Sequence, residues 1–329
     1  MLFLDNPHTN PFWNLALEEY AFEHIAKEEP MLIFWQNDNS IIVGKFQNTV
    51  EEINVPYVSR NGIRVARRLS GGGAVYHDMG NLNFTIITSA HDIESINLHA
   101  FSMPLKKTLQ EIGIDAQISG RNDVLIDGKK FCGQSQYIKD GRIMHHGSIL
   151  FHSDLRVLSQ ALKVSDDKII SHGHKSVRSR VTNIVDYLKI PLSLQNFKEL
   201  FKRNISSSTK LEEIHFDAST LSKVQLLSAG KYATWSWNYG KNPDCSIHKK
   251  RRIEGFGSIE VSMNVKENCI SEISIHGDFF GSLDISPVYQ LLIGTPLEQS
   301  AFEQKMRNFP LECYFANLKR DDFIDLFLK

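Results

Sequence analysis

Cysteine is scarce in this 329-residue chain, and its few copies are scattered. The four cysteines are Cys132, Cys245, Cys269 and Cys313, and no two of them form a Cys-x-x-Cys pair. Closely spaced cysteines are typical of a disulfide framework or a structural zinc site. Their absence argues against both and suits a protein of a reducing compartment.

Long apolar runs and an excess of charge are also missing. The first residues, Met1–Pro7, carry no basic leader, and no apolar span approaches the length of a membrane helix. Lysine and arginine total 37 against 38 for aspartate and glutamate, so no overall charge attracts nucleic acid or an anionic membrane. We therefore expect a cytoplasmic protein without nucleic-acid or membrane partners, in which any basic site is local.

The common nucleotide-binding glycine motifs are absent, but another glycine-rich stretch is present. No Gly-x-x-x-x-Gly-Lys-[Ser/Thr] occurs, and no Gly-x-Gly-x-x-Gly opens a helix. Residues 67–78 read Arg-Arg-Leu-Ser-Gly-Gly-Gly-Ala-Val-Tyr-His-Asp, between β-rich segments at 62–68 and 74–77. Three glycines allow positive φ and bring several N–H groups close to an anion. A plain hairpin turn is the alternative, but Arg67 and Arg68 favour a loop that binds phosphate or carboxylate.

The first part of the chain alternates between helical and β patterns. Amphipathic helices are predicted at 14–28 and 100–112. The β-rich runs 31–35 and 40–44 flank a polar turn and predict an antiparallel hairpin, and 81–88 continues the sheet. The short connections leave no room for βαβ crossovers, so the pattern indicates an α+β fold with a largely antiparallel sheet.

A strand, an Asp-Gly turn and a second strand are predicted for residues 119–133. In ordinary register this hairpin brings Arg121, Asp123 and Lys130 close together. The polar, basic stretch 172–183 is irregular, and its residues alone leave open whether it is an ordinary solvated loop or part of a site. Further elements are expected as a strand at 142–151, helices at 153–164, 194–206 and 221–232, strands at 257–265 and 269–277, and helices from 285, 296 and 321.

The length favours two domains of unequal size. We place the first at 1–245, where Trp235 and Trp237 are expected to be core anchors at its close. The second, 253–329, reads as a small α+β domain. Because every motif named here lies before it, we expect its removal to spare part of the chemistry.

Five motifs, taken together and in this order, resemble the lipoate–protein ligase A family of the biotin/lipoate protein ligase superfamily. They are residues 67–78, Ser-Gly-Arg-Asn-Asp at 119–123, Lys-Phe-Cys-Gly at 130–133, His-His-Gly-Ser at 145–148 and Ser-Val-Arg-Ser-Arg-Val-Thr-Asn at 176–183. The resemblance implies a biotin/lipoate ligase-like catalytic domain, with a mostly antiparallel sheet flanked by helices, and a small α+β C-terminal accessory domain.

The resemblance also implies an ATP-dependent enzyme that works in two steps. Lipoate and ATP give lipoyl-AMP and pyrophosphate, and the lipoyl group then passes to a lysine of a lipoyl-carrier domain. The implied ligands are ATP, Mg²⁺ and lipoate. The implied partners are the acyltransferase subunits of 2-oxoacid dehydrogenases or the glycine-cleavage H protein, with the enzyme itself a monomer. The motifs do not decide which carrier is used or whether octanoate replaces lipoate.

Site residues follow from the same resemblance. Lys130 is the implied catalytic residue, since its ammonium can touch both the lipoate carboxylate and the α-phosphate. The implied ATP-binding residues are Arg68, Gly73, Ala74, Val75, Tyr76, Asp123, Lys130 and Arg178. The implied lipoate-binding residues are Ser70, Gly71, Gly72, His77, Lys130 and His146. Asp123 is the candidate Mg²⁺ ligand, and Leu17 and Val43 are either walls of the acyl slot or ordinary core.

Two other readings of the same residues stay open at this point. The superfamily also includes transferases that carry the acyl chain on a cysteine thioester without ATP, and Cys132 is the candidate for that role. A small buried hydrophobe is the simpler interpretation of Cys132. The histidines at 145, 146, 172 and 174 have no third ligand at a zinc-like spacing, which argues against a histidine metal site.

Overall fold

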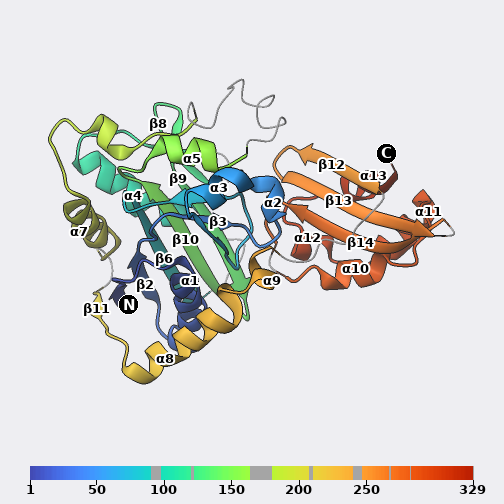
Figure 1. Cartoon of the computed structure of the whole chain (residues 1–329), viewed down its shortest axis with the longest axis horizontal. Coiled ribbons are helices and arrows are strands. Elements are labelled where there is room, and N and C mark those ends of the chain that lie inside the picture. The colour runs from blue at the N-terminus through green and yellow to red at the C-terminus, as the bar shows by residue number, and fades with distance from the viewer. Residues whose placement is uncertain are drawn as a thin grey trace.

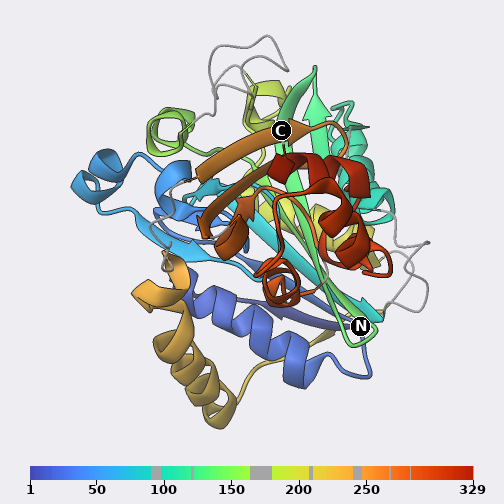
Figure 2. The same cartoon turned by 90° about the vertical axis from the view of Figure 1, so that its right-hand side faces the viewer.

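The computed structural model describes residues 1–89, 98–119, 122–163, 180–206, 210–239, 247–266, 268–281 and 283–328. Its architecture is α+β, as predicted, with two sheets in the N-terminal region (residues 1–239) and one in the C-terminal region (residues 247–328) (Figure 1). Each helix in the described ranges is too short or too polar to span a bilayer. Seen from its own side, the C-terminal region lies over the middle of the N-terminal region (Figure 2).

An eight-stranded sheet is the centre of the N-terminal region. Its order is β11 (Glu212–Glu213), β1 (Leu2–Asp5), β2 (Met31–Trp35), β6 (Asn81–Ser89), β10 (Arg142–Leu150), β9 (Lys129–Lys139), β8 (Asp123–Ile126) and β7 (Gln117–Ser119). In this order, every neighbouring pair from β2 to the β7 edge is antiparallel. The two pairs at the other edge, β11 with β1 and β1 with β2, are parallel. The prediction of a largely antiparallel sheet is therefore confirmed.

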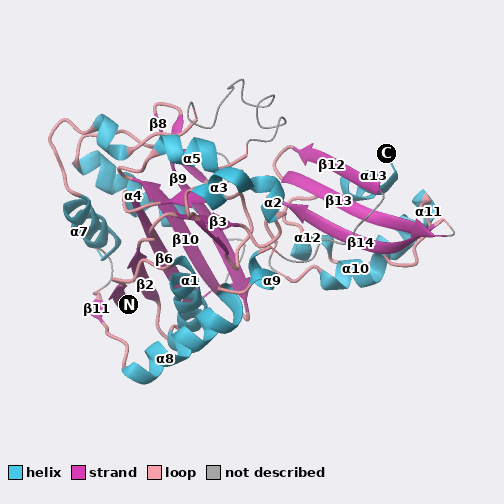
Figure 3. Ribbon diagram, in the orientation of Figure 1, coloured by secondary structure: helices cyan, strands magenta, loops and turns pink. Residues whose placement is uncertain are grey.

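The two faces of this sheet have different surroundings. One face packs an aromatic core against helices α4 (Leu98–Glu111) and α7 (Leu194–Ile205), where the Phe201 ring contacts those of Phe34 and Phe84. The other face meets α1 (Pro11–Tyr20), its π-helical extension η1 (Ala21–Ile25) and a second, three-stranded sheet. Layers of helix and sheet thus cover both sides (Figure 3).

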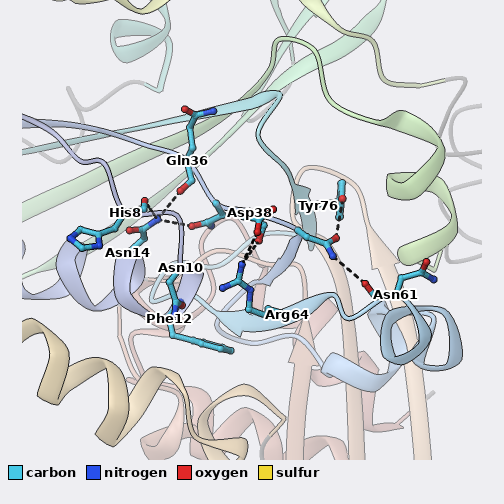
Figure 4. Close-up of polar contacts among 11 residues, drawn as sticks. His8, Asn10, Phe12, Asn14, Gln36, Asp38, Asn61, Arg64 and Tyr76 are labelled. Atoms are coloured by element: carbon cyan, nitrogen blue, oxygen red, sulfur yellow. Dashed lines mark hydrogen bonds and ion pairs between the residues drawn. The ribbon is translucent and has the colours of Figure 1, made fainter. Parts of the chain in front are cut away.

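The predicted hairpin of 31–35 with 40–44 is wrong, because its two strands belong to different sheets. The second strand, β3 (Ser40–Val43), lies between β4 (Arg64–Arg67) and β5 (Val75–His77) in the three-stranded sheet. Side chains from elsewhere fix the connecting residues 36–39 (Figure 4). Asn14 donates to the Gln36 carbonyl at 2.8 Å and Tyr76 donates to Asn39 Oδ1 at 3.2 Å, so the polar turn carries the chain from one sheet to the other.

The expectation that crossovers are excluded is also wrong. Strands β1 and β2 are parallel with α1 between them, and β3 and β4 are parallel with α2 (Thr49–Glu52) and α3 (Val55–Arg60) between them. Helix α1 begins earlier than predicted, because Asn10 caps it by accepting from the Phe12 N–H at 3.0 Å. The segment before residue 14 was long enough to hold a strand and a cap.

The C-terminal region contains one strand more than predicted. Its sheet is β12 (Ile247–Ile253), β13 (Gly257–Lys266) and β14 (Cys269–Gly277), packed against α10 (Ser286–Leu292), α11 (Gln299–Met306), α12 (Leu311–Tyr314) and α13 (Arg320–Leu328). The basic stretch 248–252 forms the edge strand β12, where charged side chains reach solvent. Phe46 of the N-terminal region is part of this core and stacks on Phe279 at 4.8 Å.

The remaining helices include one correction to the predicted core. They are α5 (Leu155–Ala161), the 3₁₀ turn η3 (Ile184–Tyr187), α8 (Ala218–Leu227) with its π-helical extension η5 (Ser228–Tyr232), and α9 (Trp235–Asn238). Trp235 is 63% exposed and is not a core anchor. Trp237 is partly buried, and its indole donates to the Arg67 carbonyl at 2.9 Å.

Candidate active site

A cavity of about 590 Å³ lies where the large sheet, the three-stranded sheet and the C-terminal region meet. Its size is that of a small-molecule site. Nine of the predicted site residues line it: Arg68, Gly72, Gly73, Ala74, Val75, His77, Asp123, Lys130 and His146. The glycine-rich loop and the hairpin that carries Lys130 therefore line the same cavity.

One row of residues across five strands forms much of the cavity floor. Trp35 pairs with Asn83, Asn83 with Ser148, Ser148 with Gly133, and Gly133 with Asp123. Residues that pair directly in a sheet point to the same face, and all five line the cavity. The sequence analysis identified only Asp123 of this row, because the others become neighbours through register alone.

Lys130 reaches the cavity because of an irregularity in β9. Val124 pairs with Cys132 and Leu125 pairs with Lys130, so Phe131 is an extra residue on β9, a β-bulge. The Lys130 ammonium lies 2.8 Å from Asp123 Oδ1, and about a third of the lysine side chain is exposed. A Cβ on Gly133 would be 2.7 Å from the same ammonium, so the glycine makes room for it.

The bulge places Cys132 on the opposite face from Lys130. Cys132 is fully buried in the aromatic core, beside Phe131. Burial raises the pKa of its thiol to about 12, although Lys130 acts in the other direction. A thiol that is neutral and away from the cavity cannot carry an acyl chain, so the simpler interpretation of Cys132 is confirmed.

The glycine-rich loop is held from beneath by Arg68. The guanidinium of Arg68 donates to the carbonyls of Gly71 at 2.7 Å and Gly73 at 2.9 Å, and Gly72 takes φ +89° between them. Burial lowers the pKa of Arg68 to about 10, which leaves it charged at neutral pH. Hydrogen bonds from a charged guanidinium thus fix the backbone of this loop.

Arg67 has a different task from the one that its charge predicts. Its guanidinium donates to the carbonyls of Gly44, Gln47 and Asn238, at 2.7–2.9 Å. It does not line the cavity, and it joins three segments of backbone. Only one of the two arginines is therefore available to an anion in the cavity.

Two histidines at the cavity are fixed by buried partners. His146 contacts Ser70 Oγ through Nε2 at 2.6 Å and Glu18 Oε1 through Nδ1 at 3.0 Å. His77 contacts Ser148 Oγ at 3.0 Å, and burial lowers its pKa to about 3, so it is neutral at physiological pH. Glu18 is a buried carboxylate that the sequence analysis missed.

The C-terminal region forms part of the cavity wall. Arg252 and Asp278 line the cavity, and the Gly72 N–H donates to the Phe279 carbonyl at 3.3 Å. The expectation that removal of this region spares part of the chemistry was based on sequence order alone. The packing brings residues from far along the chain to the glycine-rich loop.

The other predicted residues lie nearby or outside the described chain. Ser70 and Gly71 support the loop from behind, and the Tyr76 hydroxyl points to Asn39, away from the cavity. Leu17 and Val43 pack in the core, whereas Leu15 and Ile42 line the cavity. Arg121, Arg178 and residues 172–179 lie outside the described residues. The end of the basic stretch is described, and there the Lys130 backbone pairs with Arg180 at 2.8 Å and Thr182 at 2.9 Å.

Two family models match the chain. A lipoyl protein ligase A/B catalytic domain matches residues 10–206, and a bacterial lipoate protein ligase C-terminus matches residues 242–327. The lipoate-protein ligase LplJ of Bacillus subtilis is 41% identical over 99% of each chain. Lipoate–protein ligase 1 of Staphylococcus aureus is 38% identical, also over 99% of each chain.

Solved structures share the fold. Plasmodium falciparum LipL1, solved with lipoate, is 24% identical, with a TM-score of 0.80 over 99% of each chain. A lipoate-protein ligase A bound with ATP is 30% identical, with a TM-score of 0.63, and covers 73% of this chain and 97% of its own. The bipartite lipoate protein ligase of Thermoplasma acidophilum, studied with its E2 lipoyl domain, is 32% identical, with a TM-score of 0.64 over 75% and 98% of the two chains. The family and fold predicted from the five motifs are confirmed, and the chain belongs to the lipoate–protein ligase family.

Proposed function

We propose how this ATP-dependent lipoate–protein ligase carries out its two steps, with Lys130 as the residue that contacts both reacting anions. The observation that carries the proposal is the Lys130 ammonium in the cavity, across from the glycine-rich loop and beside Asp123. A carboxylate and a triphosphate repel each other. A fixed cation between them lowers that repulsion and holds the reacting atoms close.

In the first step a carboxylate oxygen of lipoate attacks the α-phosphorus of ATP. A new O–P bond forms, the bond to the bridging oxygen breaks, and pyrophosphate leaves with that electron pair. We assign the α-phosphate to Lys130 and to the backbone at Gly73 and Ala74, with Arg68 as the cation beneath the loop. Charge that develops on the phosphoryl oxygens meets donors that are already in place.

Asp123 fits Mg²⁺ only as a single protein ligand. Among the described residues, no group of three histidine, cysteine, aspartate or glutamate side chains could hold a metal. Mg²⁺ in such enzymes is commonly bound by one or two carboxylates together with substrate phosphates. We therefore propose that Asp123 shares the ion with the nucleotide, where the ion would neutralise phosphate charge.

In the second step a lysine amine of the carrier attacks the acyl carbon of lipoyl-AMP. The amide bond forms, the bond to the phosphate oxygen breaks, AMP leaves, and the amine loses a proton to solvent. We propose that the acceptors are lipoyl-carrier domains of 2-oxoacid dehydrogenases or the glycine-cleavage H protein, and that the enzyme acts as a cytoplasmic monomer. We also propose a catalytic domain of residues 1–245 and an accessory domain that begins at Ile247 rather than 253, because β12 pairs with β13.

The test is to incubate the protein with ATP, Mg²⁺, lipoate and separate apo carriers, and to weigh each carrier by mass spectrometry. The wild-type protein should add one lipoyl group, and Lys130→Ala should add none at the same time point. Lys129→Ala is the matched control, because Lys129 is adjacent on β9 and exposed. Equal modification by Lys130→Ala and the wild type would remove Lys130 from the mechanism.

A further inference from the structure

Asn83 is a buried amide that lines the cavity, and its NH₂ group has no hydrogen-bond partner in the part of the chain that the structure describes. It is 1% exposed, and among the described residues nothing accepts from its Nδ2. Other buried asparagines nearby are engaged: Asn81 donates to Ser148 and to the Ile149 carbonyl, at 2.9 and 2.8 Å. A buried donor left unpaired costs about 1–3 kcal/mol. That cost is recovered if a ligand supplies the acceptor.

The position of Asn83 relative to Lys130 indicates which part of the ligand it meets. The Lys130 ammonium lies over Gly133, and Gly133, Ser148 and Asn83 are successive members of one cross-strand row. Two strand spacings of about 4.8 Å separate Gly133 from Asn83, roughly 10 Å in all. Five staggered C–C bonds between the lipoate carboxyl carbon and its ring span roughly 6 Å, and the sulfurs lie further out. With its carboxylate at Lys130, lipoate therefore reaches Asn83 with the dithiolane ring.

The surroundings of Asn83 fit a ring of that kind. Trp35 pairs with Asn83 and lines the cavity, and Leu15 and Ile42 line it from the same apolar cluster as Trp35. The indole N–H of Trp35 already donates to Thr85 Oγ1 at 2.9 Å, and His77 is engaged with Asn37 and Ser148. Of the described polar groups at this position, the Asn83 amide is the one that keeps an unpaired donor. Sulfur is a weak acceptor, whereas the methyl end of a saturated fatty acid accepts nothing.

We propose that Asn83 is a specificity-determining residue that favours lipoate over saturated fatty acids by donating a hydrogen bond to a dithiolane sulfur. The proposal rests on the function proposed above, since it takes the carboxylate to lie at Lys130. A site built around a donor rejects an analogue without the acceptor, because binding that analogue leaves the buried donor unpaired. Octanoate is such an analogue, of similar length.

The experiment compares Asn83→Leu with the wild type, using lipoate and octanoate as alternative substrates. Leucine has nearly the shape of asparagine without its polar atoms. We expect kcat/KM for lipoate, measured by acid-dependent pyrophosphate release, to fall about 5- to 10-fold, as for the loss of one modest hydrogen bond. We expect kcat/KM for octanoate to be unchanged or higher. The substrate ratio, defined as kcat/KM for octanoate divided by kcat/KM for lipoate, should thus rise at least about fivefold.

Ser40→Ala is the matched control. Ser40 is also fully buried, and its hydroxyl has no partner among the described residues, but it lies on β3 outside the cavity lining. Its substrate ratio should equal that of the wild type. Both variants should match or exceed the wild-type melting temperature without ligand, because each removes an unpaired buried group. Asn83→Val, smaller and suited to a strand, replaces Asn83→Leu if the latter is insoluble.

The outcomes separate this proposal from the function on which it rests. A ratio that stays within twofold of the wild type overturns the role of Asn83. An equal loss with both acids also overturns it, and would indicate that the amide contacts the nucleotide or the shared carboxylate. If the wild-type protein releases no pyrophosphate with either acid, the proposed function itself is refuted.

Discussion

Gly133→Ala tests the position of the Lys130 ammonium rather than its presence. The added Cβ would lie 2.7 Å from Lys130 Nζ and 2.8 Å from its Cε. Heavy atoms that are not bonded settle at about 3.5–4.0 Å, so the ammonium must move by roughly 1 Å. It is the end of a flexible side chain, and the shift should leave the surrounding strands in place.

The size of the expected effect follows from that displacement. A misplacement of about 1 Å in a catalytic group can cost on the order of 100-fold in rate, or roughly 2.7 kcal/mol of barrier. We expect lipoate-dependent pyrophosphate release by Gly133→Ala to be about 10- to 100-fold slower than in the wild type, measured in a single turnover. The melting temperature should change by no more than about 2 °C, since no core contact is lost.

Gly230→Ala is the control for a glycine substitution without a neighbour. A Cβ at Gly230 would meet nothing within 4 Å, and Gly230 lies on η5. This variant should keep the wild-type rate. Wild-type pyrophosphate release by folded Gly133→Ala would refute the reasoning, because it would mean that the ammonium does not act from the place where the structure puts it.

Three further outcomes follow from the geometry. Cys132→Ser should retain most of its activity, and a mass check of the enzyme should find no acyl thioester; loss of activity together with a wild-type thioester would restore the transferase reading. Gly72→Val should stay folded and lose use of both ATP and lipoate, because φ is +89° and its Cβ would lie 3.0 Å from the Arg68 guanidinium; normal lipoyl-AMP formation would argue against a binding role for the loop. His145 is buried with its pKa lowered to about 3, so the unfolded chain gains a proton below about pH 6.5 that the folded chain does not. The free energy of unfolding should fall as the pH falls from about 6.5 to 3, by up to about 1.4 kcal/mol per pH unit for this group. In urea titrations over this pH range, the free energy of unfolding of His145→Phe should fall less steeply than that of the wild type.

Local patterns predicted the local structure well. The turn between β8 and β9 has positive φ at Asp127 and Gly128, as the Asp-Gly pair predicts, and Lys130 does lie beside Asp123. The glycine-rich loop does run from strand to strand without a helix behind it. Each of these features depends on residues that are close in the chain, where propensity and spacing carry the information.

Pairing between distant strands could not be predicted in the same way. The runs 31–35 and 40–44 are both rich in β-forming residues, and nothing in either of them shows that one pairs with β6 and the other with β4 and β5. Asn83 and Ser148 likewise become neighbours through register. Arg67 shows a different limit, since a charge in a sequence does not distinguish an anion ligand from a cap on backbone carbonyls.

The two faces of the large sheet have a consequence for how this enzyme can evolve. On β6, Phe84 packs into the aromatic core, while its neighbours Asn83 and Thr85 point to the opposite side. Between Leu82 and Ile86, the apolar positions of β6 therefore lie in the aromatic core, and the alternating polar positions lie on the cavity side. At Asn83, a lineage under selection for a new acyl group can therefore change a cavity residue without altering the aromatic core, which lies on the far side of the same strand.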